Sequence, residues 1–202
     1  MTKEIRKIEV IPYNPKWPLQ FEDEASKIQD ALGDNFVNIH HIGSTAIPGL
    51  AAKPKIDIIA VVQHPEKSVK QLQSIGYDFR GEYNIPLHYG FSKRGTASVN
   101  LQVYEENHPE IELNLTFRDY IRSHPKVRDE YSQLKFGLLE KETSFEKNNS
   151  MFTGYNLGKN SFIHRILKKT EFNRLRFVIC KHFDEWDAAK HFRRKYFFNK
   201  EL

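Results

Sequence analysis

Apolar residues along the chain recur with two different periods, which predict helices in some segments and strands in others. The first helical pattern has four members at steps of three or four: Phe21, Ala25, Ile28 and Leu32. Gly33 follows this pattern and is expected to end the helix. Runs rich in β-branched and aromatic residues indicate strands, and they lie near residues 38–42, 56–62, 77–82, 87–92 and 98–104.

Proline and glycine mark the limits of several other segments. A short extended segment over residues 8–11 stops at a proline-rich stretch. Pro65 opens a helical pattern that Gly76 ends. A long helical region runs over about residues 110–141, and His124-Pro125 is expected to interrupt it because the residue before proline disfavours the helical conformation.

The C-terminal segment, residues 171–202, carries a separate apolar stripe. Its members again stand three or four positions apart: Phe172, Leu175, Ile179, Phe183, Trp186, Ala189 and Phe192. The pattern predicts a basic, aromatic helix attached to a domain of residues 1–170. Soluble monomers rarely expose such a face, so we expect it to be buried against the long helical region or against a second copy in a homodimer. Contact with nucleic acid or a membrane surface is the alternative.

Positive charge is concentrated at the C-terminal end. The whole chain has 31 Lys and Arg against 26 Asp and Glu, whereas residues 159–202 have 12 against 5. The basic character therefore belongs to the last quarter, and the overall charge does not predict a nucleic-acid-binding protein. No apolar run approaches the roughly 18 residues of a membrane span, and the N-terminus lacks the apolar core of a secretory signal. Cys180 is the single cysteine, which excludes an intramolecular disulfide and favours a cytoplasmic location.

The segment from His41 to Val62 carries the strongest chemical signal. Asp57 stands within a run of β-branched residues, where burying a charge is costly unless it is paired or bound to a metal. A lysine nearby, Lys53 or Lys55, would explain it as an ion pair, and a cation site is the alternative. Upstream, Gly43-Ser44 form a turn in which a hydroxyl and backbone N–H groups can hold a phosphate.

Three motifs resemble those of a known family. Gly-Ser, then twelve residues, then an Asp on a strand is similar to the signature of the nucleotidyltransferase superfamily. The segments 12–18, 41–54 and 117–122 also resemble the hallmarks of the GrpB family, also called UPF0157, in a match that extends over about residues 8–141. The resemblance implies an α/β (α+β) domain, a nucleotidyltransferase-like mixed β-sheet flanked by helices. It also implies a nucleoside triphosphate ligand, with Asp57 on Mg²⁺ and Ser44 on the terminal phosphates.

The carboxylates that two-metal transfer requires are incomplete. Ile59 stands where a second strand carboxylate is usual, and Asn100 and Gln102 replace the histidines that relatives tend to carry. Neutral amides are poorer hosts for Mg²⁺ than carboxylates, although Glu82 is a candidate second metal ligand beside Asp57. Two functions therefore stay open: transfer of a nucleotidyl group with Mg²⁺, or nucleotide binding and interaction without catalysis.

The other candidate site residues follow from these motifs. Asp57 and His41 are the candidate catalytic residues. The candidate substrate-binding residues are Gly43, Ser44, Thr45, Lys55, His88 and Arg118. For His88 the alternative is an exposed hairpin, and for Arg118 it is an ion pair with Asp119. The nucleobase and the acceptor are not defined by these residues.

Overall fold

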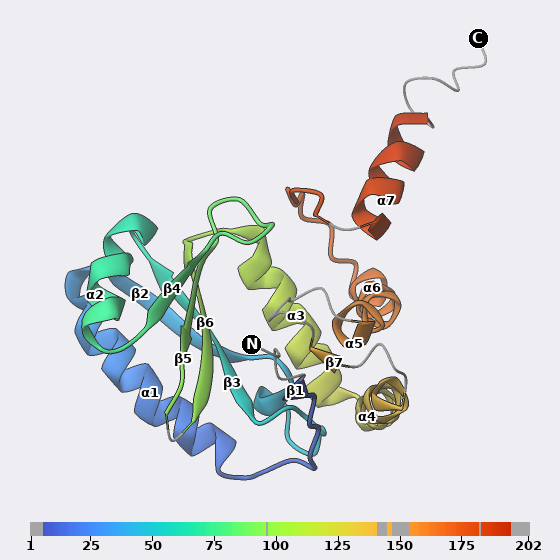
Figure 1. Cartoon of the computed structure of the whole chain (residues 1–202), viewed down its shortest axis with the longest axis horizontal. Helices are drawn as coiled ribbons and strands as arrows, with labels where there is room; N and C mark the ends of the chain where they lie inside the picture. The colour runs from blue at the N-terminus through green and yellow to red at the C-terminus, as the bar shows by residue number, and fades with distance from the viewer. Residues whose placement is uncertain (1–5, 96, 141–144, 147–153, 182, 195–202) are drawn as a thin grey trace, which may run out of the picture.

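A five-stranded mixed sheet forms the centre of the computed structural model, which describes residues 6–95, 97–140, 145–146, 154–181 and 183–194 (Figure 1). Its strands are β2 (Phe36–Ile42), β3 (Lys55–Val62), β4 (Asp78–Gly81), β5 (Tyr89–Lys93) and β6 (Ser98–Glu105), in the order β2-β3-β6-β5-β4. Only β3 and β6 of this sheet run parallel; the other neighbours are antiparallel. The expected mixed sheet flanked by helices is thus confirmed.

One face of the sheet is covered by α1 (Trp17–Leu32) and α2 (Ser68–Ser74) (Figure 1). Side chains alternate along a strand, so every second residue of β3 faces these helices. Ile56, Ile58, Ala60 and Val62 therefore share a core with α1 residues such as Ile28. The helix ends at Leu32, just before Gly33, as expected, and it begins at Trp17, about one turn before the first member of the apolar pattern.

The other face of the sheet turns toward a layer of helices. These are α3 (Pro109–Ser123), α4 (Pro125–Leu139), α5 (Gly154–Leu157) and α6 (Asn160–Lys169). The remaining residues of β3, which are Lys55, Asp57, Ile59 and Val61, lie on this side, where Ile59 and Val61 pack near Ile111 of α3. His124-Pro125 separates α3 from α4, as expected. Lys55 and Asp57 are the polar members of this strand face, at the end where the helical layer leaves a cavity.

Short elements complete the framework. They are the 3₁₀ turns η1 (Gly33–Asn35), η2 (Ser44–Ala46) and η3 (Pro65–Lys67), and a two-stranded ribbon of β1 (Arg6–Lys7) and β7 (Phe145–Glu146). The extended segment expected at 8–11 differs: the strand is β1, and only Ile11 of that segment forms a bridge, with Ala52.

The prediction for the C-terminal segment is wrong in two respects. The helix α7 covers only Phe183–Arg193, and residues 172–181 have no regular secondary structure. The face expected to pack on the long helical region is exposed in this chain, because Leu175, Phe183, Trp186 and Phe192 are each more than half exposed, and its burial against a second copy stays a prediction. The apolar side chains of α7 stay exposed because no other described helix or strand covers α7, which projects away from the sheet (Figure 1).

Some expectations fall outside the described residues. They include the basic end of the C-terminal stripe, residues 195–202, and the N-terminal residues 1–5. The division of the chain at residue 170 stays a prediction. Within the described residues, no helix combines the length and the apolar character that crossing a membrane requires.

Candidate functional site

A cavity of about 530 Å³ lies at the end of β3 where Asp57 projects. Its lining comes from the η2 turn, strands β3 to β6, the loop between β4 and β5, and helices α4 and α5. Five of the expected site residues meet here: Ser44, Thr45, Lys55, Asp57 and His88. The Gly-Ser turn and the strand carboxylate are therefore parts of one site.

Gly43 lets the turn approach Asp57 closely. It has φ +68°, a conformation that favours glycine, and a Cβ at this position would lie 2.6 Å from Asp57 Oδ2. Asn100 donates a hydrogen bond to Asp57 Oδ1 across 3.0 Å, because the parallel register of β3 and β6 pairs these two residues. Burial raises the pKa of Asp57, and the Asn100 hydrogen bond and Lys55 oppose that rise.

Lys135 of α4 forms the inner wall of the cavity. Its ammonium nitrogen donates hydrogen bonds to Ser44 Oγ at 2.6 Å and to the carbonyl of Ala51 at 2.7 Å, and the residue is only 2% exposed. Burial lowers the pKa of Lys135 to about 6, with Lys159 lowering it further and Asp57 raising it. Lys135 is thus a buried amine in direct contact with the serine of the Gly-Ser turn.

Lys159 adds a second basic group beside the same carboxylate. It lies just before α6, with its nitrogen 4.7 Å from the centre of the Tyr155 ring and hydrogen-bonded to Asn156 Oδ1 at 3.3 Å. Burial and the charge of Lys53 lower the pKa of Lys159 to about 8, whereas Asp57 opposes the shift. Lys53 packs over the same ring, at 4.6 Å.

The lining of the cavity is strongly basic. Six basic side chains line it: Lys53, Lys55, Arg80, Arg94, Lys135 and Lys159. Asp57 is the one carboxylate among the described lining residues. Such an excess of positive charge attracts a multiply charged anion and repels a divalent cation.

His41 lies on the other face of the sheet. Ile42 pairs with Asp57, so the preceding side chain points the opposite way, where it stacks on Phe21 of α1 at 4.7 Å. Its Nε2 pairs with Thr45 Oγ1 at 3.1 Å, and burial lowers the pKa of His41 to about 4. His41 therefore contacts the turn from the α1 side of the sheet, and it does not line the cavity.

Arg118 also lies outside the cavity. It pairs with Asp119, the alternative that the sequence left open, and donates a hydrogen bond to the carbonyl of His41 at 2.9 Å. Arg122 likewise donates two hydrogen bonds to the carbonyl of Ala46. These arginines of α3 fix the backbone around the Gly-Ser turn.

Glu82 is not brought to the cavity that contains Asp57. Its carboxylate accepts a hydrogen bond from the Leu87 N–H at 3.0 Å, and its carbonyl oxygen pairs with His88 Nδ1 at 3.0 Å. His88 does line the cavity and is 4% exposed, with Nε2 buried and without a hydrogen-bond partner. Glu82 thus holds the loop before β5 through hydrogen bonds, and the imidazole ring of His88 is the part of this loop that lines the cavity.

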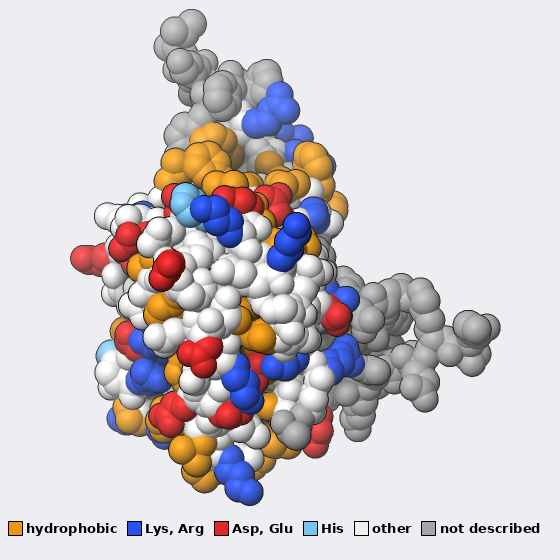
Figure 2. All heavy atoms as spheres, turned by 90° about the vertical axis from the view of Figure 1, so that its left-hand side faces the viewer, with side chains coloured by type: hydrophobic (Ala, Val, Ile, Leu, Met, Phe, Trp, Pro, Cys, Tyr) orange, Lys and Arg blue, Asp and Glu red, His pale blue; other side chains and the backbone are white. Residues whose placement is uncertain are grey.

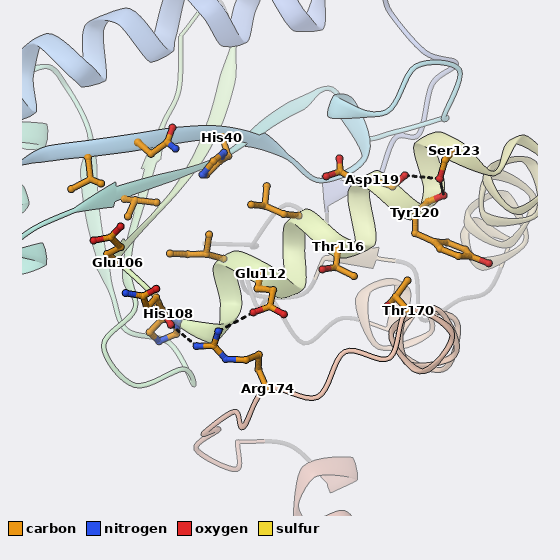
Figure 3. Close-up of a pocket in the computed structure, with 16 residues that line it drawn as sticks. His40, Glu106, His108, Glu112, Thr116, Asp119, Tyr120, Ser123, Thr170 and Arg174 are labelled. Atoms are coloured by element: carbon orange, nitrogen blue, oxygen red, sulfur yellow. Dashed lines mark hydrogen bonds and ion pairs between the residues drawn. The ribbon is translucent and has the colours of Figure 1, made fainter.

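A second hollow, of about 710 Å³, lies between α3 and the β2 edge of the sheet (Figure 3). His40, Glu112 and Asp119 line it, together with Arg174 from the C-terminal segment. None of the Gly-Ser turn, Asp57 or Lys135 borders this space. The chemistry that the sequence indicates therefore belongs to the smaller cavity.

Lys135 and Lys159 were missed from the sequence. Lys135 had a signal, because it lies four residues after Tyr131 and three before Leu138, both buried, and so shares the buried face of α4. A lysine at such a position is unusual and indicates a partner inside the protein. Lys159 had no comparable signal, since it precedes a short helix outside the long apolar pattern.

The mixed sheet and the Gly-Ser turn facing a strand aspartate define a nucleotidyltransferase-like fold. The poly(U) polymerase Cid1, in a structure with Mg and 3′-dATP bound, matches it with a TM-score of 0.53 over 73% of this chain and 49% of that chain, at 15% identity. The chain belongs to the GrpB family, whose model, described as GrpB protein, matches residues 7–169.

Two relatives show the extent of this similarity. GrpB of Enterococcus faecalis is 32% identical, with a TM-score of 0.70 over 80% of this chain and 96% of that chain. UPF0157 protein YqkA of Bacillus subtilis is 40% identical over 134 residues, which are 64% of this chain and 39% of YqkA. The chain thus matches less than half the length of YqkA.

A pair of Mg²⁺ ions, which the nucleotidyltransferase-like fold implies, does not fit these residues. Asp57 is already hydrogen-bonded to Asn100, an amide that stands beside it in the sheet. In the part of the chain that the structure describes, no three His, Cys, Asp or Glu side chains form a group that could hold a metal. Neutral amides and lysines do not replace the carboxylates that Mg²⁺ requires.

Proposed function

We propose that this protein binds a nucleoside triphosphate in the 530 Å³ cavity through its phosphate chain, as a nucleotide-binding module without two-metal transfer. The observation that carries the proposal is the basic lining of the cavity, in which six Lys and Arg side chains oppose Asp57. Phosphate oxygens take hydrogen bonds from ammonium and guanidinium groups, and these bonds are stronger than those between neutral groups.

Ser44 and Lys135 are the expected contacts for the terminal phosphates. Lys135 Nζ lies 2.6 Å from Ser44 Oγ. One phosphate oxygen can therefore accept a hydrogen bond from each of them in place of the hydrogen bond between them. An anion arriving there also favours protonation of Lys135, whose pKa burial has lowered. The positive charge of Lys135 then neutralises part of the negative charge of the phosphates, as a metal ion does in two-metal transferases.

The cavity is long enough for more than the phosphates. It extends from Lys55 and Asp57 on β3, across Asn100 on β6 and Ser92 on β5, to Arg80 on β4. Three strand spacings of about 4.8 Å make this distance roughly 14 Å. We therefore infer that the nucleoside lies toward the β4 end, against the loop that contains His88.

Calorimetric titration tests this function. The full-length protein is titrated with ATP, tripolyphosphate and adenosine in the presence of EDTA, and again with Mg²⁺. We expect ATP and tripolyphosphate to bind in EDTA and adenosine to bind far more weakly. Ser44→Ala should weaken both phosphate ligands roughly tenfold, because a hydrogen bond to a charged group is lost.

Ser74→Ala is the matched control, because Ser74 lies on α2 and is hydrogen-bonded to the carbonyl of Gln71. This variant should bind like the wild type. Equal losses for ATP and adenosine in Ser44→Ala would mean that the turn is only structural. Binding of ATP that requires Mg²⁺, together with release of pyrophosphate, would favour nucleotidyl transfer over this proposal.

A further inference from the structure

The segment that follows α6 returns to the main body of the structure before α7 begins. Arg174 pairs with Glu112 of α3 at 2.9 Å and donates a hydrogen bond to the carbonyl of Asn107 at 2.8 Å (Figure 3). Arg176 pairs with Glu110, a residue that is almost completely buried. These contacts direct the chain from the helical layer toward the loop between β4 and β5.

Ile179, Lys181 and Glu185 then bind that loop directly. The Ile179 N–H donates a hydrogen bond to the carbonyl of Asn84 at 2.8 Å, and the Asn84 side-chain amide donates one to Glu185 Oε1 at 2.7 Å. The ammonium group of Lys181 donates to the carbonyl of Tyr83. Glu185 Oε2 accepts the Lys181 N–H at 2.7 Å, so the segment is also fixed within itself.

The loop that these residues hold is part of the cavity wall. Tyr83, Asn84, Ile85 and His88 all line the cavity. Tyr83 has φ +56° and Leu87 has φ +62°, conformations that are unfavourable for residues other than glycine. Such a loop keeps its shape only where contacts with its surroundings favour it, and the C-terminal segment supplies contacts to two consecutive residues of the loop.

We propose that Lys181 and Glu185 are positioning residues of the nucleotide site, which hold Tyr83 and Asn84 in place for the nucleoside part of the ligand. This inference rests on the proposed function and adds to it that the segment after α6 belongs to the site. It assigns a role to residues that lie beyond the matched family region, residues 7–169. Neither side chain lines the cavity, so both act through the loop.

The test compares two ligands in full-length variants. Glu185→Ala removes the acceptor of the Asn84 amide, and we expect the Kd for ATP to rise roughly tenfold. The Kd for tripolyphosphate, held at the Ser44 end, should change less than about twofold because the lost contact is at the nucleoside end. Asp187→Ala, which removes an exposed carboxylate from the same helix, should leave both constants unchanged.

A double-mutant cycle identifies the route of the effect. If Glu185 acts through Asn84, the Asn84→Ala/Glu185→Ala protein binds ATP no more weakly than Asn84→Ala alone. Hydrogen exchange of residues 82–88 should become faster in Glu185→Ala and stay unchanged in Asp187→Ala. An unchanged Kd for ATP in Glu185→Ala, or equal losses of ATP and tripolyphosphate, would overturn this inference alone. A wild-type protein that binds neither ligand would overturn the proposed function with it.

Discussion

Gly43 of the Gly-Ser turn lies directly against the side chain of Asp57 on β3. The φ of Gly43 is +68°, and the space where its Cβ would lie is occupied by the Asp57 carboxylate. The sequence indicated that Gly43 makes room, although we expected the room to serve a ligand. In the structure it serves a side chain of the protein, which fixes that carboxylate against the turn.

Replacing Gly43 by alanine should therefore destabilise the fold and displace Asp57. We expect a loss of about 3 kcal/mol in the free energy of unfolding, the sum of an unfavourable φ and overpacking. Gly33→Ala is the control, because Gly33 has φ +51° but nothing within 4 Å of a Cβ; it should lose only about 1 kcal/mol. Urea unfolding measures the free energy of unfolding of both variants. Equal losses in Gly43→Ala and Gly33→Ala would show that the contact of the added Cβ with Asp57 has no cost.

Lys135 should make the stability of the protein depend on pH. Its pKa is lowered to about 6 in the folded chain, against about 10.4 in an unfolded chain. Between these values the unfolded chain binds more protons, so the free energy of unfolding rises with pH, by at most about 1.4 kcal/mol per pH unit from this residue. The cost of burying Lys135 is therefore greatest at and below about pH 6, and it is relieved as the pH rises toward about 10.4.

Urea unfolding between about pH 6 and about pH 8 tests this dependence, because in that range the lowered pKa of Lys135 dominates over that of Lys159. Lys135→Met has similar volume and no charge, and should show a clearly smaller slope. The same slope in both proteins would mean that another group is responsible.

At the scale of the elements, the sequence predicted those helices and strands that bury an apolar face. The helix and strand patterns of residues 17–139 were confirmed because each element covers one face of a core, so its apolar period reports a real interface. The positions of His41 and Arg118 depended instead on strand register and on which carbonyls an arginine meets. Those facts are tertiary, and the sequence pattern does not contain them.

The register of β3 and β6 makes Asn100 the position where a second carboxylate would stand beside Asp57. We expect Asn100→Asp to create a weak site for Mg²⁺, since two carboxylates then share one end of the cavity. Without a cation the variant should be less stable than the wild type by about 1–3 kcal/mol, because like charges are brought together and a hydrogen bond is lost. With Mg²⁺ its melting temperature should rise by mass action.

Thermal denaturation with and without Mg²⁺ measures this effect. Asn38→Asp is the control, as it adds the same charge at an exposed residue of β2. Its melting temperature should not respond to Mg²⁺. If Asn100→Asp does not respond either, the lysines of the cavity still exclude the cation.

On the scale of the whole molecule, the C-terminal segment departs from the pattern of the rest. Leu175, Phe177, Phe183, Trp186 and Phe192 are all more than half exposed. In Figure 2, hydrophobic side chains gather near the top of the view, the end of the molecule that carries this segment. The sequence predicted a helical apolar stripe over residues 172–192, of which only residues 183–192 are helical, and a helical period does not report whether a partner covers the face. The homodimer and nucleic-acid contact that the stripe suggested stay predictions.

Because Trp186 is exposed, replacing it should change the free energy of unfolding far less than replacing a typical tryptophan. A buried tryptophan costs roughly 3–5 kcal/mol when it is replaced by alanine. Trp186 is 54% exposed, so Trp186→Ala should change the free energy of unfolding by less than about 0.5 kcal/mol. Trp17→Ala is the matched control, because Trp17, the first residue of α1, is 2% exposed in the core and should show the full loss. Urea unfolding of both variants at low and at high protein concentration gives the decisive measurement. A large loss for Trp186→Ala that grows with protein concentration would mean that a second copy covers α7, whereas a large loss at every concentration would mean that α7 packs against its own chain.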